Sequence, residues 1–382
     1  MLYITLDDGY SSVYQSQVID VCNYISKNFE TRVRLIAFFS PRVYFQNRKK
    51  IKKAYKHSII LPLFPLQRWG WNVIPLLILN FFMRHKTAIC RNPFATNLGV
   101  KMRQYSLLKN IVYDGRGATY AEWNEYDVTP DEALRNSVKP AETIAVLESD
   151  FKIAVSQKLV DYWHKQFGYT GKKHVVIPTT LLSNFAHSDF TDERIREVKA
   201  EFGFEEKDVI LVYSGSSAGW QSFNLVTDFL ATQILKNSRV KILFLTKEDD
   251  FVRSLKERFP KNVFVKWVDH HFINLYLSVG DYGILIREQS LTNSVASPTK
   301  FAEYLALGLP VLISENLGDY SDFVRQHRCG WIVTSAEMEM NLQKRPHEEK
   351  QRLVELSRKY FYKESAQNHL SYSVLLQELN II

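Results

Sequence analysis

The sequence predicts an α/β protein of two domains, each built around a parallel sheet. The chain has 382 residues, 46% of them hydrophobic. One ordinary core does not accommodate that many, so two domains of roughly 180 residues are expected. In the second half, short apolar segments alternate with helical patterns, as in parallel sheets whose strands are joined by right-handed crossovers.

Short apolar runs mark the strands of the first half. The expected strands are Leu2 to Leu6, Arg32 to Phe39, Thr87 to Cys90, Asn110 to Tyr113, Phe151 to Val155 and His174 to Ile177. An amphipathic helix around Val18 to Ile25 follows the first of them. A second helix, Gln157 to Phe167, has Ser156 as its N-cap and Gly168 as its end.

The alternation of strand and helix is more regular in the second half. The expected strands are Val209 to Tyr213, Val240 to Leu245, Val263 to Trp267, Tyr282 to Ile286, Pro310 to Ile313 and Trp331 to Val333. The polar, turn-rich segment from Pro178 to Phe190 separates the two halves and is the expected linker.

The segment from Ser297 to Ser314 combines a helix and a strand. Ser297 suits an N-cap and Pro298 the first helical position, so a helix is expected to begin at Pro298. Gly308 ends it, and Leu309 to Ile313 reads as a buried strand. The helical repeat predicts an apolar face with Phe301, Ala302, Leu305 and Ala306, and a polar face with Thr299, Lys300, Glu303 and Tyr304.

The start of that helix is a candidate anion site. Free backbone N–H groups and the positive end of the helix dipole favour a diphosphate, and Lys300 adds a full charge. Glu303 lies about 9 Å along the axis from Ser297, within reach of the ribose of a nucleotide docked by its phosphates. The alternative, which the spacing leaves open, is that Lys300 and Glu303 form a solvated ion pair.

Charge and cysteine content narrow the class of protein. The net charge of +8 and the pI near 9.1 indicate an acidic partner, whether nucleic acid, an anionic membrane or a phosphorylated substrate. The three separated cysteines, Cys22, Cys90 and Cys329, favour a reducing compartment. The N-terminus has no basic segment of a signal peptide, so a cytoplasmic location is expected.

Two neighbouring segments suggest a peripheral contact with the inner face of the cytoplasmic membrane. The basic run from Arg48 to His57 precedes the apolar segment from Trp69 to Met83, which is too short to span a bilayer. Cations beside Trp, Leu and Phe suit anionic headgroups and the bilayer boundary, although a solvated loop followed by an ordinary core helix fits equally well. No motif supports nucleic acid as a partner.

No metal or redox cofactor is expected. The adjacent His270 and His271 point apart and lack spaced partners, so they do not form a zinc site. No GxGxxG follows the first strand, which argues against a nicotinamide cofactor. The polar loop that begins DGRG at Asp114 lies at the carboxyl end of a strand, where open α/β sheets bind ligands.

The chain resembles the GT-B glycosyltransferases, especially the bacterial family 4 type that builds surface polysaccharides. The resemblance rests on SDFKIAVSQKLVDYW from Ser149, VVIPTT from Val175, VILVYSGSSAGWQ from Val209 and PTKFAEYLALGLPVLIS from Pro298. It implies two Rossmann-like domains facing a central cleft, with residues 1–178 binding the acceptor and 179–360 the donor. It also implies that residues 361–382 pack back on the first domain and that no metal is needed.

The resemblance also implies roles for individual residues. The donor site would comprise Gly215, Ser216, Gln221, Trp267, Val268, Arg287, Ser297, Pro298, Thr299, Lys300 and Glu303. Ser216 and Gln221 stand where the family has an Arg and a Lys, and Val295 replaces its first glutamate. Asp8 and Gly9 would face the phosphates from the first domain. Asp114, Arg116 and Glu122 are the candidate catalytic residues, in the region of the family's active-site histidine.

The expected function is transfer of a sugar from a nucleotide-sugar donor, preferably a UDP-sugar, to a lipid-linked or glycan acceptor. The resemblance implies retention of configuration and a role in bacterial cell-surface polysaccharide synthesis. Two alternatives are a sugar-nucleotide epimerase of the same fold and a non-enzymatic protein that binds anionic lipid.

Overall fold

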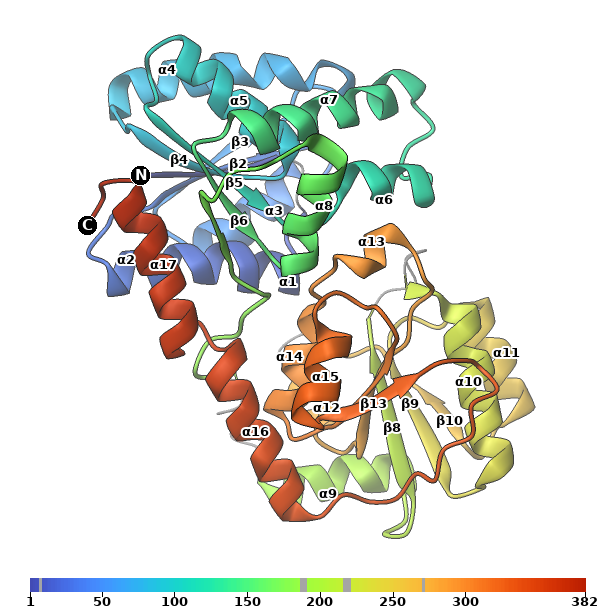
Figure 1. Ribbon diagram of the computed structural model, residues 1–382. Coiled ribbons are helices and arrows are strands. Elements are labelled where there is room, and N and C mark those ends of the chain that lie inside the picture. Colours follow the sequence, from blue (N-terminus) through green and yellow to red (C-terminus); the bar gives the residue numbers. More distant parts are fainter. Residues whose placement is uncertain (7–8, 186–190, 216–220, 270–271) are drawn as a thin grey trace. The chain divides into compact units, whose positions relative to one another are not determined.

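The computed structural model describes residues 1–6, 9–185, 191–215, 221–269 and 272–382, and the chain divides into two compact units. The first unit contains residues 1–180 and 366–382, and the second contains residues 181–365. Each unit is built around its own parallel sheet with helices on both faces (Figure 1).

The first sheet has seven parallel strands in the order β3-β2-β1-β4-β5-β6-β7. The strands are β1 (Leu2–Leu6), β2 (Arg34–Phe39), β3 (Ser58–Pro62), β4 (Thr87–Arg91), β5 (Asn110–Gly115), β6 (Phe151–Ala154) and β7 (His174–Val176). The strand order reverses between β1 and β4. Crevices at such a reversal, outside the carboxyl ends of the strands, are where open α/β sheets bind ligands.

Helices cover both faces of the first sheet. They are α1 (Ser12–Tyr14), the π-helical η1 (Gln15–Ile19), α2 (Asp20–Asn28), α3 (Tyr44–Ala54), the 3₁₀ helix η2 (Leu66–Asn72), α4 (Val73–Met83), α5 (Pro93–Gln104), α6 (Thr119–Glu125), α7 (Glu132–Glu148), α8 (Gln157–Phe167) and α17 (Ala366–Glu378). One apolar cluster joins η1, α2, α3 and α17 to the sheet, and another joins α4, α5 and α7 to its opposite face. The two helical layers are visible in Figure 1.

The second sheet has six parallel strands in the order β10-β9-β8-β11-β12-β13, which reverses between β8 and β11. The strands are β8 (Val209–Ser214), β9 (Val240–Leu245), β10 (Val263–Val265), β11 (Tyr282–Leu285), β12 (Val311–Ser314) and β13 (Gly330–Val333). The helices are α9 (Asp192–Glu201), α10 (Phe223–Lys236), α11 (Asp250–Arg258), α12 (Ile273–Leu277), α13 (Leu291–Ser294), α14 (Thr299–Ala306), α15 (Tyr320–His327) and α16 (His347–Phe361).

Helix α14 packs closely against the second sheet at Gly283, which has no side chain. The ring of Tyr304 lies over Gly283 of β11, where a Cβ would come within 2.3 Å of the ring. The Tyr304 hydroxyl accepts the backbone N–H of Ser214 at 3.1 Å and donates to the carbonyl of Ile284 at 3.4 Å. Helix α14 is therefore tied to both strands that flank the reversal of strand order.

The predicted strands are confirmed within about two residues, and β9 and α8 have the predicted bounds. Strand β3 and helix α3 were not predicted. Strand β3 is short, and α3 buries only Asn47 and Ile51, so its helical pattern of apolar residues is weak.

The Arg48 to His57 run and the Trp69 to Met83 segment do not form one surface, and a contact of either with a membrane stays a prediction. Ile51 of α3 packs in the cluster with α2, whereas Leu76 of α4 packs in the cluster with α5, on the opposite face of the sheet. Strand β3 separates the two segments along the chain.

Gly283→Ala should destabilise the second unit, because the added methyl group has to displace the Tyr304 ring from β11. We expect the free energy of unfolding to fall by about 1–3 kcal/mol, as for other overpacked cores. Denaturant unfolding followed by fluorescence measures the change. Gly117→Ala is the control, because no atom lies within 4 Å of its added Cβ. Equal stability of the two variants would contradict this description of the contact.

Candidate functional sites at the two sheet edges

A pocket of about 530 Å³ opens at the carboxyl edge of the first sheet, at the reversal between β1 and β4. Its lining comes from the ends of β1 and β4, the loop after β5, and helices α5, α6 and α7. The lining residues are Leu6, Leu66, Arg91, Asn92, Phe94, Arg116, Gly117, Thr119, Glu122, Trp123, Val128, Thr129 and Leu134. Arginines, a carboxyl group, a hydroxyl and a Trp ring suit a polar ligand with an apolar face, such as a sugar.

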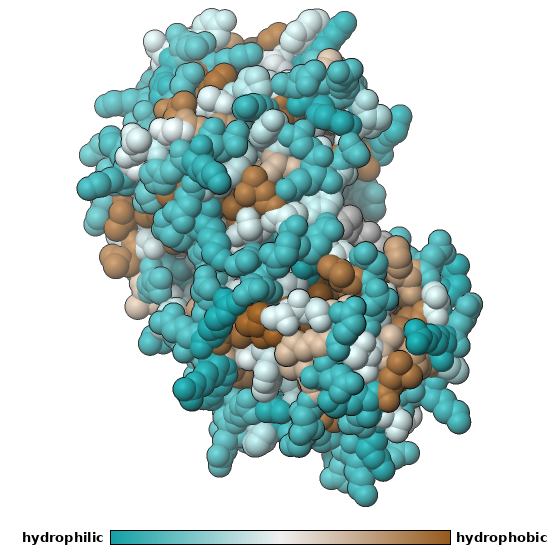
Figure 2. All heavy atoms as spheres, turned by 45° about the vertical axis from the view of Figure 1, so that its right-hand side comes forward, coloured by the Kyte–Doolittle hydropathy of each residue, from teal (hydrophilic) through white to brown (hydrophobic). Residues whose placement is uncertain are grey.

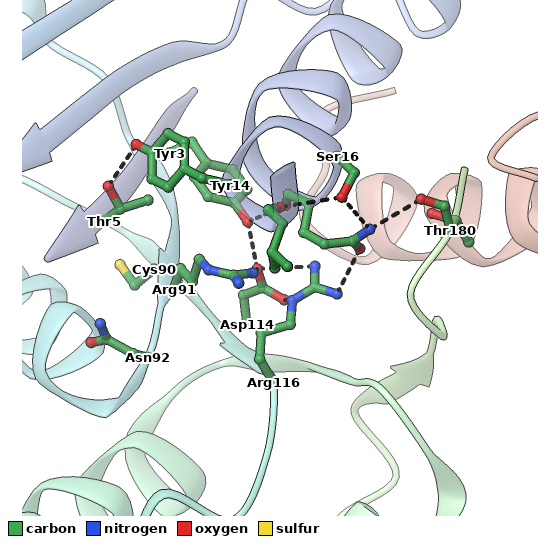
Figure 3. Close-up of polar contacts among 12 residues, drawn as sticks. Tyr3, Thr5, Tyr14, Ser16, Cys90, Arg91, Asn92, Asp114, Arg116 and Thr180 are labelled. Carbon is green, nitrogen blue, oxygen red and sulfur yellow. Dashed lines mark hydrogen bonds and ion pairs between the residues drawn. The ribbon is translucent and has the colours of Figure 1, made fainter. Parts of the chain in front are cut away.

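The carboxylate of Asp114 organises the charges beside this pocket (Figure 3). Asp114 is 0% exposed, and its Oδ2 accepts the hydroxyl of Tyr3 and, at 3.2 Å, Nη2 of Arg116. Nε of Arg116 lies 2.8 Å from Oδ1, and Nη1 of Arg91 lies 3.8 Å from Oδ2. A carboxylate enclosed by two guanidinium groups and a hydroxyl fixes those groups in place.

Arg116 is held in its charged form. Burial lowers the pKa of its guanidinium, but the charge and hydrogen bond of Asp114, together with Tyr3 and Tyr372, outweigh burial and raise that pKa. On its other side, Nη1 of Arg116 lies 3.5 Å from the side-chain oxygen of Gln17. Gln17 belongs to the π-helical η1, and its side-chain nitrogen donates to the carbonyl of Thr180. The guanidinium is thus oriented from both sides at the edge of the pocket.

Glu122 lines the pocket from α6, and burial raises the pKa of its carboxyl group. A carboxyl group with a raised pKa in a pocket is a candidate for proton transfer. Glu142 of α7 lies beneath, and its Oε2 accepts the N–H of Tyr120 at 2.7 Å. Because no side chain of Ala118 caps α6, Glu142 supplies that acceptor and fixes the start of the helix that carries Glu122.

The second candidate site lies at the reversal between β8 and β11. Gly215 follows β8, and Arg287 lies two residues beyond β11. The backbone N–H of Arg287 donates to Oγ of Ser314 at 2.6 Å, and its Nη1 donates to Oδ1 of Asn293 at 3.3 Å. Arg287 is buried, so these contacts fix its guanidinium at the carboxyl edge of the sheet.

Lys300 and Glu303 lie in the first two turns of α14. Nζ of Lys300 donates to Oε2 of Glu303 at 2.7 Å, and Glu303 is only 4% exposed. Glu303 and Tyr304, which the helical repeat assigns to the polar face, are both buried, because α14 is enclosed by the sheet and by α16. The pair is not a fully solvated surface ion pair.

The predicted cap of α14 is wrong by one residue. Pro298 occupies the N-cap position, and Thr299 is the first helical residue. Oγ of Ser297 is instead 2.6 Å from the hydroxyl of Tyr320 on α15. The side chain of Pro298 makes no capping hydrogen bond to α14.

The structure describes the positions of some of the remaining predicted residues but not of others. Asp8, Ser216, His270 and His271 lie outside the described residues. Gly9 is exposed after β1, and Gln221 directly precedes Ser222 and α10. Trp267 is 63% exposed, whereas Val268 packs against the core of the second unit. Each stays a prediction as a ligand contact.

Sequence reasoning missed four residues of the first site, namely Tyr3, Gln17, Arg91 and Glu142. Arg91 had a signal, because it directly follows the predicted strand Thr87 to Cys90, and strand ends are where ligands bind. The other three act through contacts with residues 22 to 111 positions away. No local pattern reveals such contacts.

A metal-binding cluster and a membrane-spanning helix are both absent from the residues that the structure describes. No three His, Cys, Asp or Glu side chains in this part of the chain are placed to hold a metal ion. Within the same residues, no helix is long and apolar enough to cross a membrane.

No protein-family model and no curated protein sequence matches the chain. Solved structures do resemble it. HepE from Anabaena in complex with UDP gives a TM-score of 0.71 at 12% identity, over 98% of this chain and 99% of that one. A glycosyltransferase from Rickettsia africae also gives 0.71 at 12% identity, over 99% and 98%. A proposed UDP-N-acetylglucosamine 2-epimerase from Listeria monocytogenes gives 0.55 at 10% identity, over 99% and 90%.

These likenesses, with the two parallel sheets, show that the chain has the GT-B fold of two Rossmann-like domains. At 10–12% identity they show the fold and not the activity.

Glu142→Gln should reduce the loss of stability with rising pH. Burial raises the pKa of the Glu142 carboxyl to about 8, well above that of an unfolded chain, so the folded protein holds a proton that the unfolded chain releases. Stability is then complete at acidic pH and falls as the pH rises toward 8, by roughly 1 kcal/mol per pH unit for this group.

Thermal melts of wild type and Glu142→Gln between acidic and slightly alkaline pH test this. As the pH rises, the melting temperature of wild type should fall relative to that of Glu142→Gln. Parallel curves over the whole range would show that Glu142 does not hold the proton.

Proposed function

We propose that the chain is a glycosyltransferase that moves a sugar from a nucleotide-sugar donor, preferably a UDP-sugar, to a lipid-linked or glycan acceptor. The observation that carries this proposal is the position of Lys300 and Glu303 on α14, which hydrogen bonds tie to the reversal point of the second sheet. The GT-B fold and the UDP bound by HepE support it.

The donor site is assigned to the second unit. The N–H groups of the first turn of α14 and the charge of Lys300 favour a diphosphate. Glu303, one turn further along, is placed to accept hydrogen bonds from ribose hydroxyls. Its carboxylate accepts a hydrogen bond from Lys300, which orients the two side chains relative to each other. Arg287 adds a fixed positive charge at the same edge of the sheet.

Catalysis in this proposal consists mainly of charge stabilisation. The bond between the sugar C1 and the diphosphate oxygen breaks, and a bond from C1 to the acceptor oxygen forms. The leaving diphosphate gains negative charge, which helix N–H groups and fixed cations stabilise. With retention of configuration, as the family resemblance implies, the acceptor proton passes to the leaving group and no strong base is required.

The acceptor is assigned to the pocket of the first unit. Asp114 neutralises part of the charge of Arg91 and Arg116, and both arginines line the pocket. Their remaining positive charge suits an acceptor with a phosphate group, as in a lipid-linked glycan at the inner face of the cytoplasmic membrane. Glu122 is the one carboxyl group among the described lining residues, so it takes the role of base if the configuration inverts.

A sugar-nucleotide epimerase is the second candidate, since a proposed epimerase also shares the fold. The two activities are separated by omitting the acceptor. Incubation of a UDP-sugar alone converts the donor sugar only in the epimerase case, whereas release of UDP with a new glycan product requires the acceptor. Proton NMR of the product also gives its anomeric configuration.

Lys300→Met and Glu303→Gln should each weaken binding of UDP by about tenfold, the effect of losing one charge-assisted interaction of about 1.4 kcal/mol. Titration calorimetry measures the dissociation constant. Arg253→Gln is the matched control, because Arg253 also pairs at i, i+3, with Asp250 on α11, and lies on an exposed helix surface. If both variants bind UDP like this control, the donor assignment is wrong.

A further inference from the structure

Helix α4 is apolar on its exposed side as well as on the side toward the core, where Val73, Leu77, Leu79 and Met83 pack beside Leu76. Its exposed side chains are Ile74, Ile78, Phe81 and Phe82, which are 51%, 58%, 65% and 76% exposed. Its fully buried residues are Leu76 and the polar Asn80. The solvent-facing side of a surface helix in a globular protein is usually polar, so the exposed side of α4 is unusual.

The exposed residues form one stripe. They are spaced four, three and one positions apart, which places them on the same side of a helix. Trp71 of η2, directly before α4, is 52% exposed, and its ring packs against Phe64 with centroids 6.1 Å apart. By contrast, the face of the molecule in Figure 2 is largely hydrophilic, with hydrophobic side chains in small groups.

Asn80 fixes this orientation of α4. Its side-chain nitrogen donates to the carbonyls of His85 and Leu107, at 2.9 and 3.0 Å, and its oxygen accepts the N–H of His85. Rotation of the helix to bury the apolar stripe would leave these backbone groups without Asn80. The exposure of the stripe is therefore built into the packing of the first unit.

Positive charge surrounds the stripe. The guanidinium of Arg68 lies 4.9 Å from the ring of Trp71, and Nζ of Lys101 lies 5.5 Å from that of Trp69. At the other end of α4, Arg84 is the C-cap residue and is exposed, as is Lys86. Cations therefore lie at both ends of the apolar stripe.

The charge extends over a long part of the sequence. Residues 31–113 contain 16 Lys and Arg and no Asp or Glu. The rest of the chain holds 33 Lys and Arg and 41 Asp and Glu, so it carries a net negative charge. The excess positive charge of the protein thus lies in this segment, although six of its 16 cations belong to the Arg48 to His57 run on the opposite face of the sheet from α4.

We infer that the exposed face of α4, with Trp71 and the flanking cations, docks on an anionic lipid bilayer. The apolar side chains enter the boundary between headgroups and acyl chains, and the cations contact lipid phosphates. A second copy of the chain fits the face less well, because a symmetric contact would bring the same cations together without an acidic partner.

The inference agrees with a lipid-linked acceptor in the proposed function but is argued from α4 alone. Vesicle binding is measured without donor or acceptor, so it can fail while transfer to a soluble acceptor persists. Conversely, loss of UDP binding in the α14 variants would leave vesicle binding unchanged.

The test is cosedimentation with phosphatidylcholine vesicles that contain or lack phosphatidylglycerol. Wild type should bind the anionic vesicles, and Ile78→Ser combined with Phe81→Ser and Phe82→Ser should bind them at least about tenfold more weakly, since apolar burial supplies much of the affinity. Leu235→Ser combined with Phe251→Ser is the matched control, because both residues are exposed apolar side chains of the second unit. This control should bind like wild type.

A second variant tests the charge. Arg84→Glu combined with Lys86→Glu should weaken binding to anionic vesicles and leave UDP binding unchanged, which also shows that the variant is folded. Added salt should weaken wild-type binding. The inference would be overturned if the triple serine variant bound anionic vesicles as tightly as wild type does. It would also be overturned if wild type bound equally well to vesicles without phosphatidylglycerol. A third contradicting result would be light scattering that shows wild type as a dimer and the triple serine variant as a monomer.

Discussion

The contact of Tyr304 with the second sheet positions the part of the molecule on which the donor assignment depends. Because Gly283 has no side chain, the ring can lie against β11, and the hydroxyl reaches the backbone of β8 and β11. These contacts hold α14 at the reversal of strand order. Because α14 is fixed and Lys300 pairs with Glu303, both side chains are restrained, which reduces the conformational entropy that binding of a nucleotide has to overcome.

In the first unit, the buried carboxylate of Asp114 fixes the arginines at the pocket. A guanidinium at the edge of a pocket is useful for binding an anionic group only if its position is fixed, and Asp114 fixes Arg91 and Arg116 together. Removing one partner from such a cluster is far more costly than never having built it. We therefore interpret the cluster as orienting the guanidinium groups of Arg91 and Arg116 at the pocket, and not as a source of stability.

Sequence and structure agree where the determinants are local. Ser156 and Gly168 bound α8 as predicted, because an N-cap and a left-handed C-terminal residue act within one turn. Ser297 had the same local signal, but its hydroxyl contacts Tyr320, so a tertiary contact replaced the cap. Asp114 and Glu122 were identified from a loop at a strand end, whereas Tyr3 and Glu142 reach that region only through the fold.

Helix α14 shows why periodicity alone fails for enclosed helices. Glu303 and Tyr304 fall on the polar side of the helical repeat, yet both are buried, because the sheet and α16 cover different sides of the helix. A polar residue in such a place needs a partner, and Lys300 supplies one for Glu303. The buried ion pair is thus a consequence of the packing that the sequence pattern did not reveal.

Amide hydrogen exchange in the presence of UDP tests the central claim most directly, because it reports where the nucleotide binds. If the N-terminus of α14 holds the diphosphate, UDP should slow exchange in the peptide that covers Thr299 to Phe301, with little change in α4. Saturating UDP that leaves this peptide unchanged and protects only segments of the first unit would contradict the assignment.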